Sequence, residues 1–153
     1  PDDSAEIERW IFNYVNIERR KAGRALLKTN WGLVRVARGH SREMATKHNI
    51  WHGQGVYLAK HRISYRSFWQ FLYRLVFQYR GCSGENVGLM YRGRVKGYRF
   101  PIRTNKQIAW AQSRAWMNSP GHRENILRPS FKMIGIGVKQ NKNGFYCTQL
   151  FYG

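Results

Sequence analysis

Three residues of this 153-residue chain carry side chains suited to metal or acid–base chemistry: His52, Glu85 and His122. Two neutral imidazoles can bind a divalent metal such as zinc and leave the remaining positions to water. A nearby glutamate can orient or deprotonate that water. The alternative is a hydrogen-bonded polar cluster that only fixes the fold. No nucleophile accompanies the three residues, so a metal-binding or structural role is favoured over catalysis.

His40 is the other histidine that the sequence places near this chemistry. It falls on the apolar face of a predicted helix together with Met44, which favours a histidine at the edge of the core or of a cleft over a metal ligand. Ser41 does not form a nucleophilic pair with it, because neighbouring residues on a helix point apart.

Helices are predicted early in the chain to position these residues. Asp3 followed by Glu6 is typical of a capping box, and Gly23 is a stop signal for the first helix. A second helix begins near Thr29 or Asn30. The faces expected to be buried carry Ile7, Trp10, Tyr14 and Ile17 in the first helix, and Leu33, Val36, Ala37, His40, Met44 and His48 in the second.

The second half of the chain predicts one more helix and then a β-hairpin. Asn105 is expected to cap the helix, and Pro120 and Gly121 are expected to end it. Apolar residues then alternate with glycine over residues 134–138, the turn residues 141–144 follow, and residues 145–151 form a second strand. Helices first and a hairpin last indicate an α+β domain.

The composition excludes a disordered basic tail and a membrane-spanning chain. Hydrophobic residues make up 42% and aromatic residues 15%, and there is no apolar run of about 18 residues. The sequence begins without a signal-like segment, so we expect any signal or anchor to lie outside it. The formal net charge of +19 indicates an anionic partner, which could be nucleic acid, an anionic membrane or an acidic cell-wall polymer. An arginine-rich surface that reflects genome bias or a hot habitat is the alternative.

Much of this charge lies in the middle of the sequence. Residues 53–106 contain eleven basic residues and one acid, Glu85. Residues 63–80 predict a helix with an apolar aromatic face, flanked by Arg62, Arg66 and Arg74 at intervals of four or eight residues. Such a helix suits contact with an anionic membrane interface, and the alternative is an ordinary surface helix packed on the core. A lone carboxylate among cations should stay ionised, which suits an acceptor better than a general acid.

The two cysteines, Cys82 and Cys147, leave two possibilities open. They could form one disulfide in an oxidising compartment, or they could be two free buried thiols. Two cysteines alone do not make a metal-binding set.

Several motifs in this order resemble the CAP superfamily of cysteine-rich secretory, antigen 5 and pathogenesis-related proteins, and most closely its compact prokaryotic SCP-like members. The resemblance extends from Tyr14 to Phe151. The motifs are Gly84-Glu85-Asn86-Val87, Ser119-Pro120-Gly121-His122-Arg123 with Asn125-Ile126-Leu127, Gly135-Ile136-Gly137, and Thr148-Gln149-Leu150-Phe151.

The resemblance implies a three-layer α-β-α sandwich with a small antiparallel sheet, formed as one domain by residues 1–153. It also implies a cleft with two histidines and two acids. Here the cleft would contain His40, His52, Glu85, Ser119 and His122, with His52 and His122 as metal ligands. Ser119 stands where the second acid would be, so the set is incomplete. Residues 53–82 would be a basic aromatic insertion beside the cleft, and family members are associated with lipids.

Three functions follow from the sequence. The favoured one is an extracellular or surface-attached module, a monomer or weak dimer, that binds anionic lipid or a cell-surface polymer through Arg62, Arg66 and Arg74. The second is a metal-assisted, peptidase-like hydrolase that uses His52, Glu85 and His122. The third is nonspecific nucleic-acid binding by charge, which the lack of a recognised nucleic-acid fold disfavours.

Overall fold

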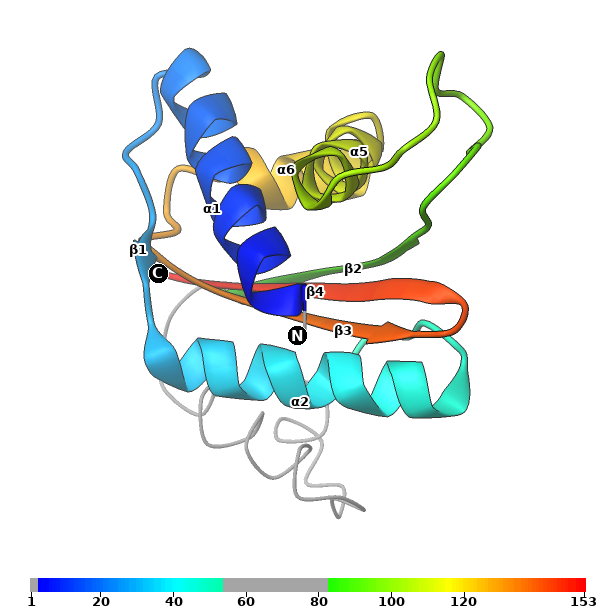
Figure 1. Cartoon of the computed structure of the whole chain (residues 1–153). Coiled ribbons are helices and arrows are strands. Elements are labelled where there is room, and N and C mark those ends of the chain that lie inside the picture. Colours follow the sequence, from blue (N-terminus) through cyan, green and yellow to red (C-terminus); the bar gives the residue numbers. More distant parts are fainter. Residues whose placement is uncertain (1–2, 54–82) are drawn as a thin grey trace.

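The structure is a computed structural model that describes residues 3–53 and 83–153. Its centre is a four-stranded sheet in the order β1-β3-β4-β2 (Figure 1). The strands are β1 (Lys28–Thr29), β2 (Ser83–Met90), β3 (Met133–Asn141) and β4 (Gly144–Tyr152). The last three pair antiparallel, whereas β1 pairs parallel to β3. The sheet is therefore mixed: the predicted antiparallel arrangement is found in β2, β3 and β4, and the short edge strand β1 adds a parallel pairing.

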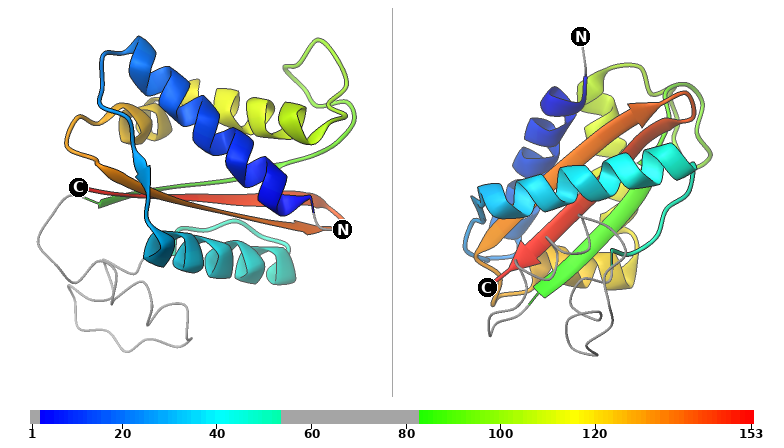
Figure 2. Two further views of the ribbon diagram at one scale, coloured as in Figure 1. Left: turned by 60° about the vertical axis from the view of Figure 1, so that its left-hand side comes forward. Right: turned by 90° about the horizontal axis from the view of Figure 1, so that it is seen from below.

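Helices cover both faces of the sheet, as the α-β-α prediction requires. The first face carries α1 (Ser4–Lys21), α5 (Asn105–Met117) and α6 (Pro120–Leu127), and the opposite face carries α2 (Trp31–Lys47) (Figures 1 and 2). The predicted α+β class and the three layers are confirmed.

The helix α2 lies very close to β3 because glycines face it. A Cβ atom added at Gly135 would lie 2.2 Å from the backbone carbon of Leu33, and one added at Gly137 would lie 2.2 Å from the backbone nitrogen of Arg38. The alternation of apolar residues with glycine thus has a packing cause: the branched residues fill one face, and the glycines admit a helix backbone on the other.

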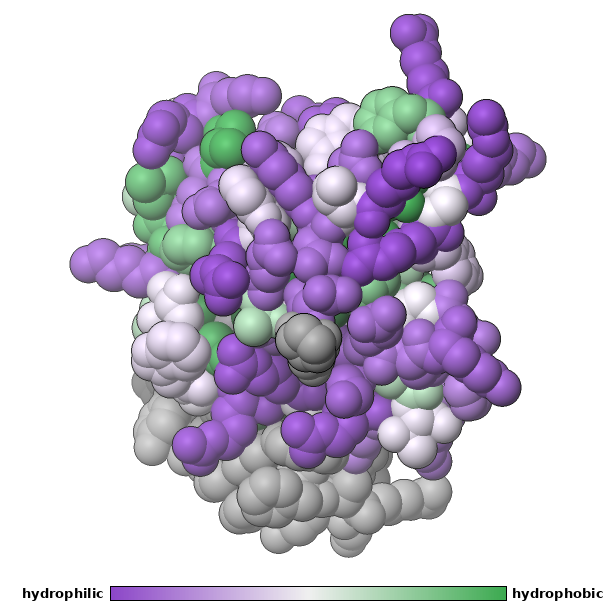
Figure 3. All heavy atoms as spheres, in the orientation of Figure 1, coloured by the Kyte–Doolittle hydropathy of each residue, from purple (hydrophilic) through white to green (hydrophobic). Residues whose placement is uncertain are grey.

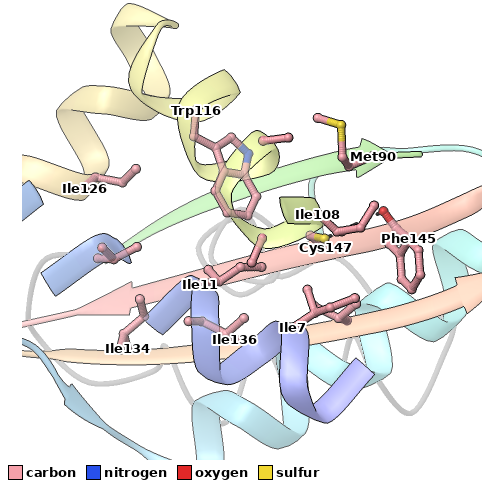
Figure 4. Close-up of a cluster of buried hydrophobic side chains, with 14 of the residues drawn as sticks. Ile7, Ile11, Met90, Ile108, Trp116, Ile126, Ile134, Ile136, Phe145 and Cys147 are labelled. Carbon is pink, nitrogen blue, oxygen red and sulfur yellow. Dashed lines mark hydrogen bonds between the residues drawn. The ribbon is translucent and has the colours of Figure 1, made fainter. Parts of the chain in front are cut away.

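The larger core lies between the sheet and the helices α1 and α5. Ile7 and Ile11 of α1 meet Ile134 and Ile136 of β3 there, and Trp116 of α5 packs above β2 (Figure 4). Burial of this apolar surface is the main contribution to stability.

The buried stripe of α1 differs from the predicted one by about one residue. The helix buries Ile7, Ile11, Val15 and Arg19, whereas Ile17 is 43% exposed. Trp10 and Tyr14 pack only partly against the core. The bulk of these aromatic side chains favoured the wrong face in the sequence.

Two of the three predicted helix caps differ from those in the structure. Asn30 caps α2 as expected, since its side chain accepts a hydrogen bond from the Leu33 amide. Asp3 makes no side-chain cap bond at α1. At α5 the cap is Thr104 with Gln107, one residue before the predicted Asn105.

Cys147 is a free thiol and fully buried. It lies in the core on the α1 face of the sheet, and burial raises the pKa of the thiol well above its usual range. The predicted bridge to Cys82 is therefore not seen at Cys147, and Cys82 lies outside the described residues.

Candidate functional site

The candidate site begins at Glu85, in the first half of β2. Glu85 pairs across the strands with Leu150, which packs on α2, so both side chains lie on the α2 face of the sheet. The carboxylate Oε1 accepts a hydrogen bond of 2.9 Å from His52 Nδ1 and one of 2.8 Å from the Gly53 amide. The loop that follows α2 is thereby fixed to the central sheet.

The contact between His52 and Glu85 controls the charge of the imidazole. The hydrogen bond to Glu85 and then its negative charge raise the pKa of His52, while partial burial opposes the rise. The Glu85 side chain is 13% exposed and that of His52 is 58% exposed. The Glu85 carboxylate is thus mostly buried, and the His52 imidazole that contacts it is exposed to solvent.

His122 approaches the same region from α6. Its Nδ1 is hydrogen-bonded to Ser119 Oγ at 2.9 Å, so the serine at the expected position of the second acid contacts the second histidine. Burial lowers the pKa of His122, and the positive charge of His52 lowers it further. The two shifts therefore have opposite signs, toward the cationic form at His52 and toward the neutral form at His122.

Pro120 begins the helix that carries His122, although the sequence predicted a helix end there. Proline suits the first position of a helix because its fixed φ is helical and its missing amide needs no partner. Ser119 precedes it as the N-cap residue and uses its hydroxyl for His122 rather than for a cap bond.

An amide network on the other face of β2 holds α6 in place. Asn86 Nδ2 donates to the backbone oxygen of His122 at 3.1 Å and to Gln149 Oε1 at 3.0 Å. Asn125 Nδ2 donates to Asn86 Oδ1 at 2.9 Å and to the backbone oxygen of Glu85 at 3.3 Å. Sequence reasoning did not single out Gln149; its signal is the closing Thr-Gln-Leu-Phe motif.

His40 supports the cleft from the core. It is buried, and its Nε2 is 2.6 Å from the backbone oxygen of Trp51. The two rings meet edge to face, with centroids 5.4 Å apart. His40 thereby fixes the residue directly before His52.

The structure describes part of the predicted binding set. Within residues 3–53 and 83–153, no group of three His, Cys, Asp or Glu side chains is arranged to hold a metal ion. The residues placed there thus do not fit a zinc site with three protein ligands. Arg62, Arg66 and Arg74 lie outside the described residues. The metal, the hydrolase activity and the insertion surface stay predictions.

The fold, an α-β-α sandwich with a His–Glu pair that joins the loop after α2 to β2, agrees with a match to a known family. Residues 12–151 match the model of the cysteine-rich secretory protein family, CAP, and the chain belongs to this family. It is 30% identical over 159 residues to the Bacillus subtilis protein YkwD, with all of this chain covered. The chain spans 49% of YkwD, about half the length of this relative.

Solved structures show the same fold. An extracellular protein containing an SCP domain from Bacillus anthracis gives a TM-score of 0.65 at 24% identity, covering 97% of this chain and 41% of that one. An outer surface protein from Borrelia burgdorferi gives 0.67 at 18% identity, covering 96% of this chain and 92% of that one. In the part of the chain that the structure describes, no helix is long and apolar enough to cross a membrane.

Proposed function

We propose that the chain is one extracellular CAP domain that attaches to an anionic lipid surface through clustered cationic side chains. Two kinds of observation support this. The solved relatives are described as an extracellular protein and an outer surface protein. The chain itself has 27 Lys and Arg residues against 8 Asp and Glu residues.

The observation that carries the proposal is a cationic loop, residues 91–104, between β2 and α5. No acid occurs from residue 86 to residue 123. Four exposed side chains of this loop have no carboxylate partner among the described residues: Arg94, Lys96, Arg99 and Arg103. Figure 3 shows hydrophilic side chains projecting from the side of the molecule on which Figure 1 draws this loop.

The cationic loop has a defined shape. Gly93 and Ile102 exchange two backbone hydrogen bonds, of 2.7 and 2.8 Å, and Ile102 is fully buried. The Tyr98 hydroxyl donates to the backbone oxygen of Ala111 at 2.7 Å. The backbone that carries these cations is therefore ordered before any partner binds, which lowers the entropy cost of binding.

Two aromatic side chains accompany these cations. Tyr91 and Phe100 are each 43% exposed. Aromatic rings favour the interfacial region of a bilayer, and basic side chains near an anionic leaflet contribute about 1 kcal/mol each. This combination favours a lipid surface over a polymer that offers charge alone.

Co-sedimentation with vesicles of phosphatidylcholine, with and without phosphatidylglycerol, tests the proposal. Two variants remove the same charge. The loop variant changes Arg94, Lys96, Arg99 and Arg103 to Gln, and the scattered variant changes Arg20, Arg35, Lys47 and Lys142 to Gln.

We expect binding only to vesicles that contain phosphatidylglycerol, with affinity that falls as NaCl increases. The loop variant should bind up to about a thousandfold more weakly, and the scattered variant only slightly more weakly. Equal losses would mean that net charge alone drives binding. A third variant has Arg62, Arg66 and Arg74 changed to Gln. It measures how much of the vesicle binding depends on the predicted insertion surface.

A further inference from the structure

A concave site lies at the outer edge of β3, away from the candidate site around Glu85. It has a volume of about 370 Å³, and α1, α2 and β3 contribute to its walls. None of His40, His52, Glu85, Ser119 and His122 lines it. The volume lies at the lower end of the range for ligand pockets.

Part of the β3 edge lies inside this pocket. Two of its residues have outward-facing backbone groups that are hydrogen-bonded to other parts of the chain. On one side, the Asn30 amide donates to the Ile134 carbonyl oxygen at 3.0 Å, after which the chain leaves the sheet for α2. On the other side, Glu8 Oε2 accepts from the Val138 amide at 3.0 Å. Arg38 holds that carboxylate with an Nη2–Oε1 bond of 2.8 Å.

Ile136 lies between Ile134 and Val138, the two residues with these hydrogen bonds. Alternate residues of an edge strand turn both backbone groups outward, and the bond from Val138 to Glu8 shows which residues do so in β3. The Ile136 amide and carbonyl therefore face outward, and no described residue bonds to either. A ligand with its own adjacent N–H and C=O would satisfy both groups, and an extended peptide offers this pair at alternate residues.

The residues that line the pocket indicate which peptide side chains would bind there. Apolar contact comes from Phe12, Val34, Ile134 and Ile136, and from Trp31, which is 72% exposed. Arg9 also lines the pocket, is exposed, and has no carboxylate partner among the residues that the structure describes. Glu8 is already bonded to Arg38 and Val138, so the unbalanced charge is positive.

We propose that this pocket binds an extended, acidic peptide segment of a partner protein. One peptide residue pairs with Ile136 through two backbone hydrogen bonds. A neighbouring apolar side chain packs against Trp31 and Phe12, and a carboxylate of the peptide meets Arg9. The site is independent of the cationic loop, so it does not depend on lipid attachment.

The test uses a fluorescein-labelled peptide of sequence Ser-Val-Val-Val-Asp-Glu and a counterpart N-methylated at all three valines. The methylated peptide keeps its charge and its side chains but lacks these backbone donors. Fluorescence anisotropy measures affinity, and amide chemical shifts in an ¹⁵N-labelled sample show where the peptide binds. The variant Arg9→Glu tests the charge, and Arg20→Glu is the matched control on the same helix, outside the pocket.

We expect saturable binding that shifts the Ile136 amide signal. N-methylation and Arg9→Glu should each weaken binding about tenfold or more, while Arg20→Glu should leave the affinity within about twofold. Absence of saturable binding would overturn the proposal, as would equal binding of the methylated peptide or shifts confined to another surface. A concentration-dependent shift of Ile136 without peptide would instead assign the edge to a second copy of the chain.

Discussion

The two histidines of the candidate site have pKa values that are shifted in opposite directions. Glu85 raises the pKa of His52, whereas burial, and after it the positive charge of His52, lowers the pKa of His122. Because the hydrogen bond to Glu85 is the largest cause of the first shift, the position of Glu85 on β2 has the strongest influence on the pKa of His52.

The coupling predicts that His52→Gln raises the pKa of His122, because the substitution removes the neighbouring positive charge. An NMR titration of the ring signals measures this shift. His48→Gln is the control, since His48 contacts Asn141 and Asn143 at the end of α2. If His122 titrates identically in the wild type and in His52→Gln, the two imidazoles do not share a cleft.

The same pair makes folding stability depend on pH. The pKa of His52 is raised above the ordinary histidine value of 6.5, so the stabilisation is fully present below that pH and is lost as the pH rises through the folded-state pKa. Denaturant unfolding should therefore show that Glu85→Gln costs more stability below pH 6.5 than in alkaline solution. Since His52 is largely exposed, the effect should be under about 1 kcal/mol. A cost that is equal at every pH would contradict the pairing.

Arg19 is the residue whose burial the sequence did not suggest. It is fully buried, and its guanidinium donates to the backbone oxygens of Ala25, Ile126, Arg128 and Phe131 at 2.8 to 3.2 Å. It thereby joins the end of α1 to the segment that leads from α6 to β3.

We expect Arg19→Met to lower the free energy of unfolding by about 2–4 kcal/mol, because carbonyl oxygens that Arg19 satisfies would lose their donor. Thermal and denaturant unfolding measure the loss. Arg20→Met, at the exposed neighbour, should stay within about 0.5 kcal/mol of the wild type. Equal stability of the two variants would show that water replaces the guanidinium at little cost.

Among the elements, the contact of α2 with β3 sets the spacing of two layers. Gly137→Ala should destabilise the fold by about 2 kcal/mol or more, because its Cβ would lie 2.2 Å from helix backbone that cannot move away. Gly121→Ala is the control, since nothing lies within 4 Å of its added Cβ and alanine favours the helix. Circular dichroism melting curves compare the two variants. An unchanged midpoint in Gly137→Ala would mean that α2 can shift on the sheet.

Elements with local signals could be predicted from the sequence, and those that depend on distant contacts could not. The cap at Asn30 and the turn at residues 141–144 act within a few residues, so the start of α2 and the hairpin were predicted correctly, whereas His48, expected on the buried face, is exposed just beyond the end of α2. The parallel pairing of β1 depends on β3, which lies about a hundred residues further along the chain. No local pattern indicates such a pairing.

For the candidate site, too, the residues could be predicted from the sequence, but most of their contacts could not. The family motifs identified His52, Glu85 and His122, because residue types at motif positions can be read directly. The contact of His52 with Glu85 joins residues 33 positions apart and depends on the register of β2 with β4. The contact of Ser119 with His122 joins residues only three positions apart. It was not predicted, because the sequence indicated a helix end at Pro120, whereas Pro120 begins the helix that carries His122.

At the scale of the whole molecule, the charge that suits an anionic surface also opposes folding. With 27 cationic side chains and 8 carboxylates, most cations have no acid to pair with, and their mutual repulsion destabilises the compact state. The described ion pairs, such as Arg38 with Glu8 and Arg114 with Glu18, offset only part of it.

Added NaCl should therefore raise the melting temperature, because screening weakens repulsion among exposed charges. Calorimetry at increasing NaCl measures the slope. The loop variant should show a smaller rise than the wild type, since it removes four cations that lie close together, and the scattered variant should fall between them. Surface ion pairs weaken in salt, so a melting temperature that falls with NaCl would mean that attraction outweighs repulsion. Equal slopes for the two variants would mean that the cationic loop holds no special concentration of charge.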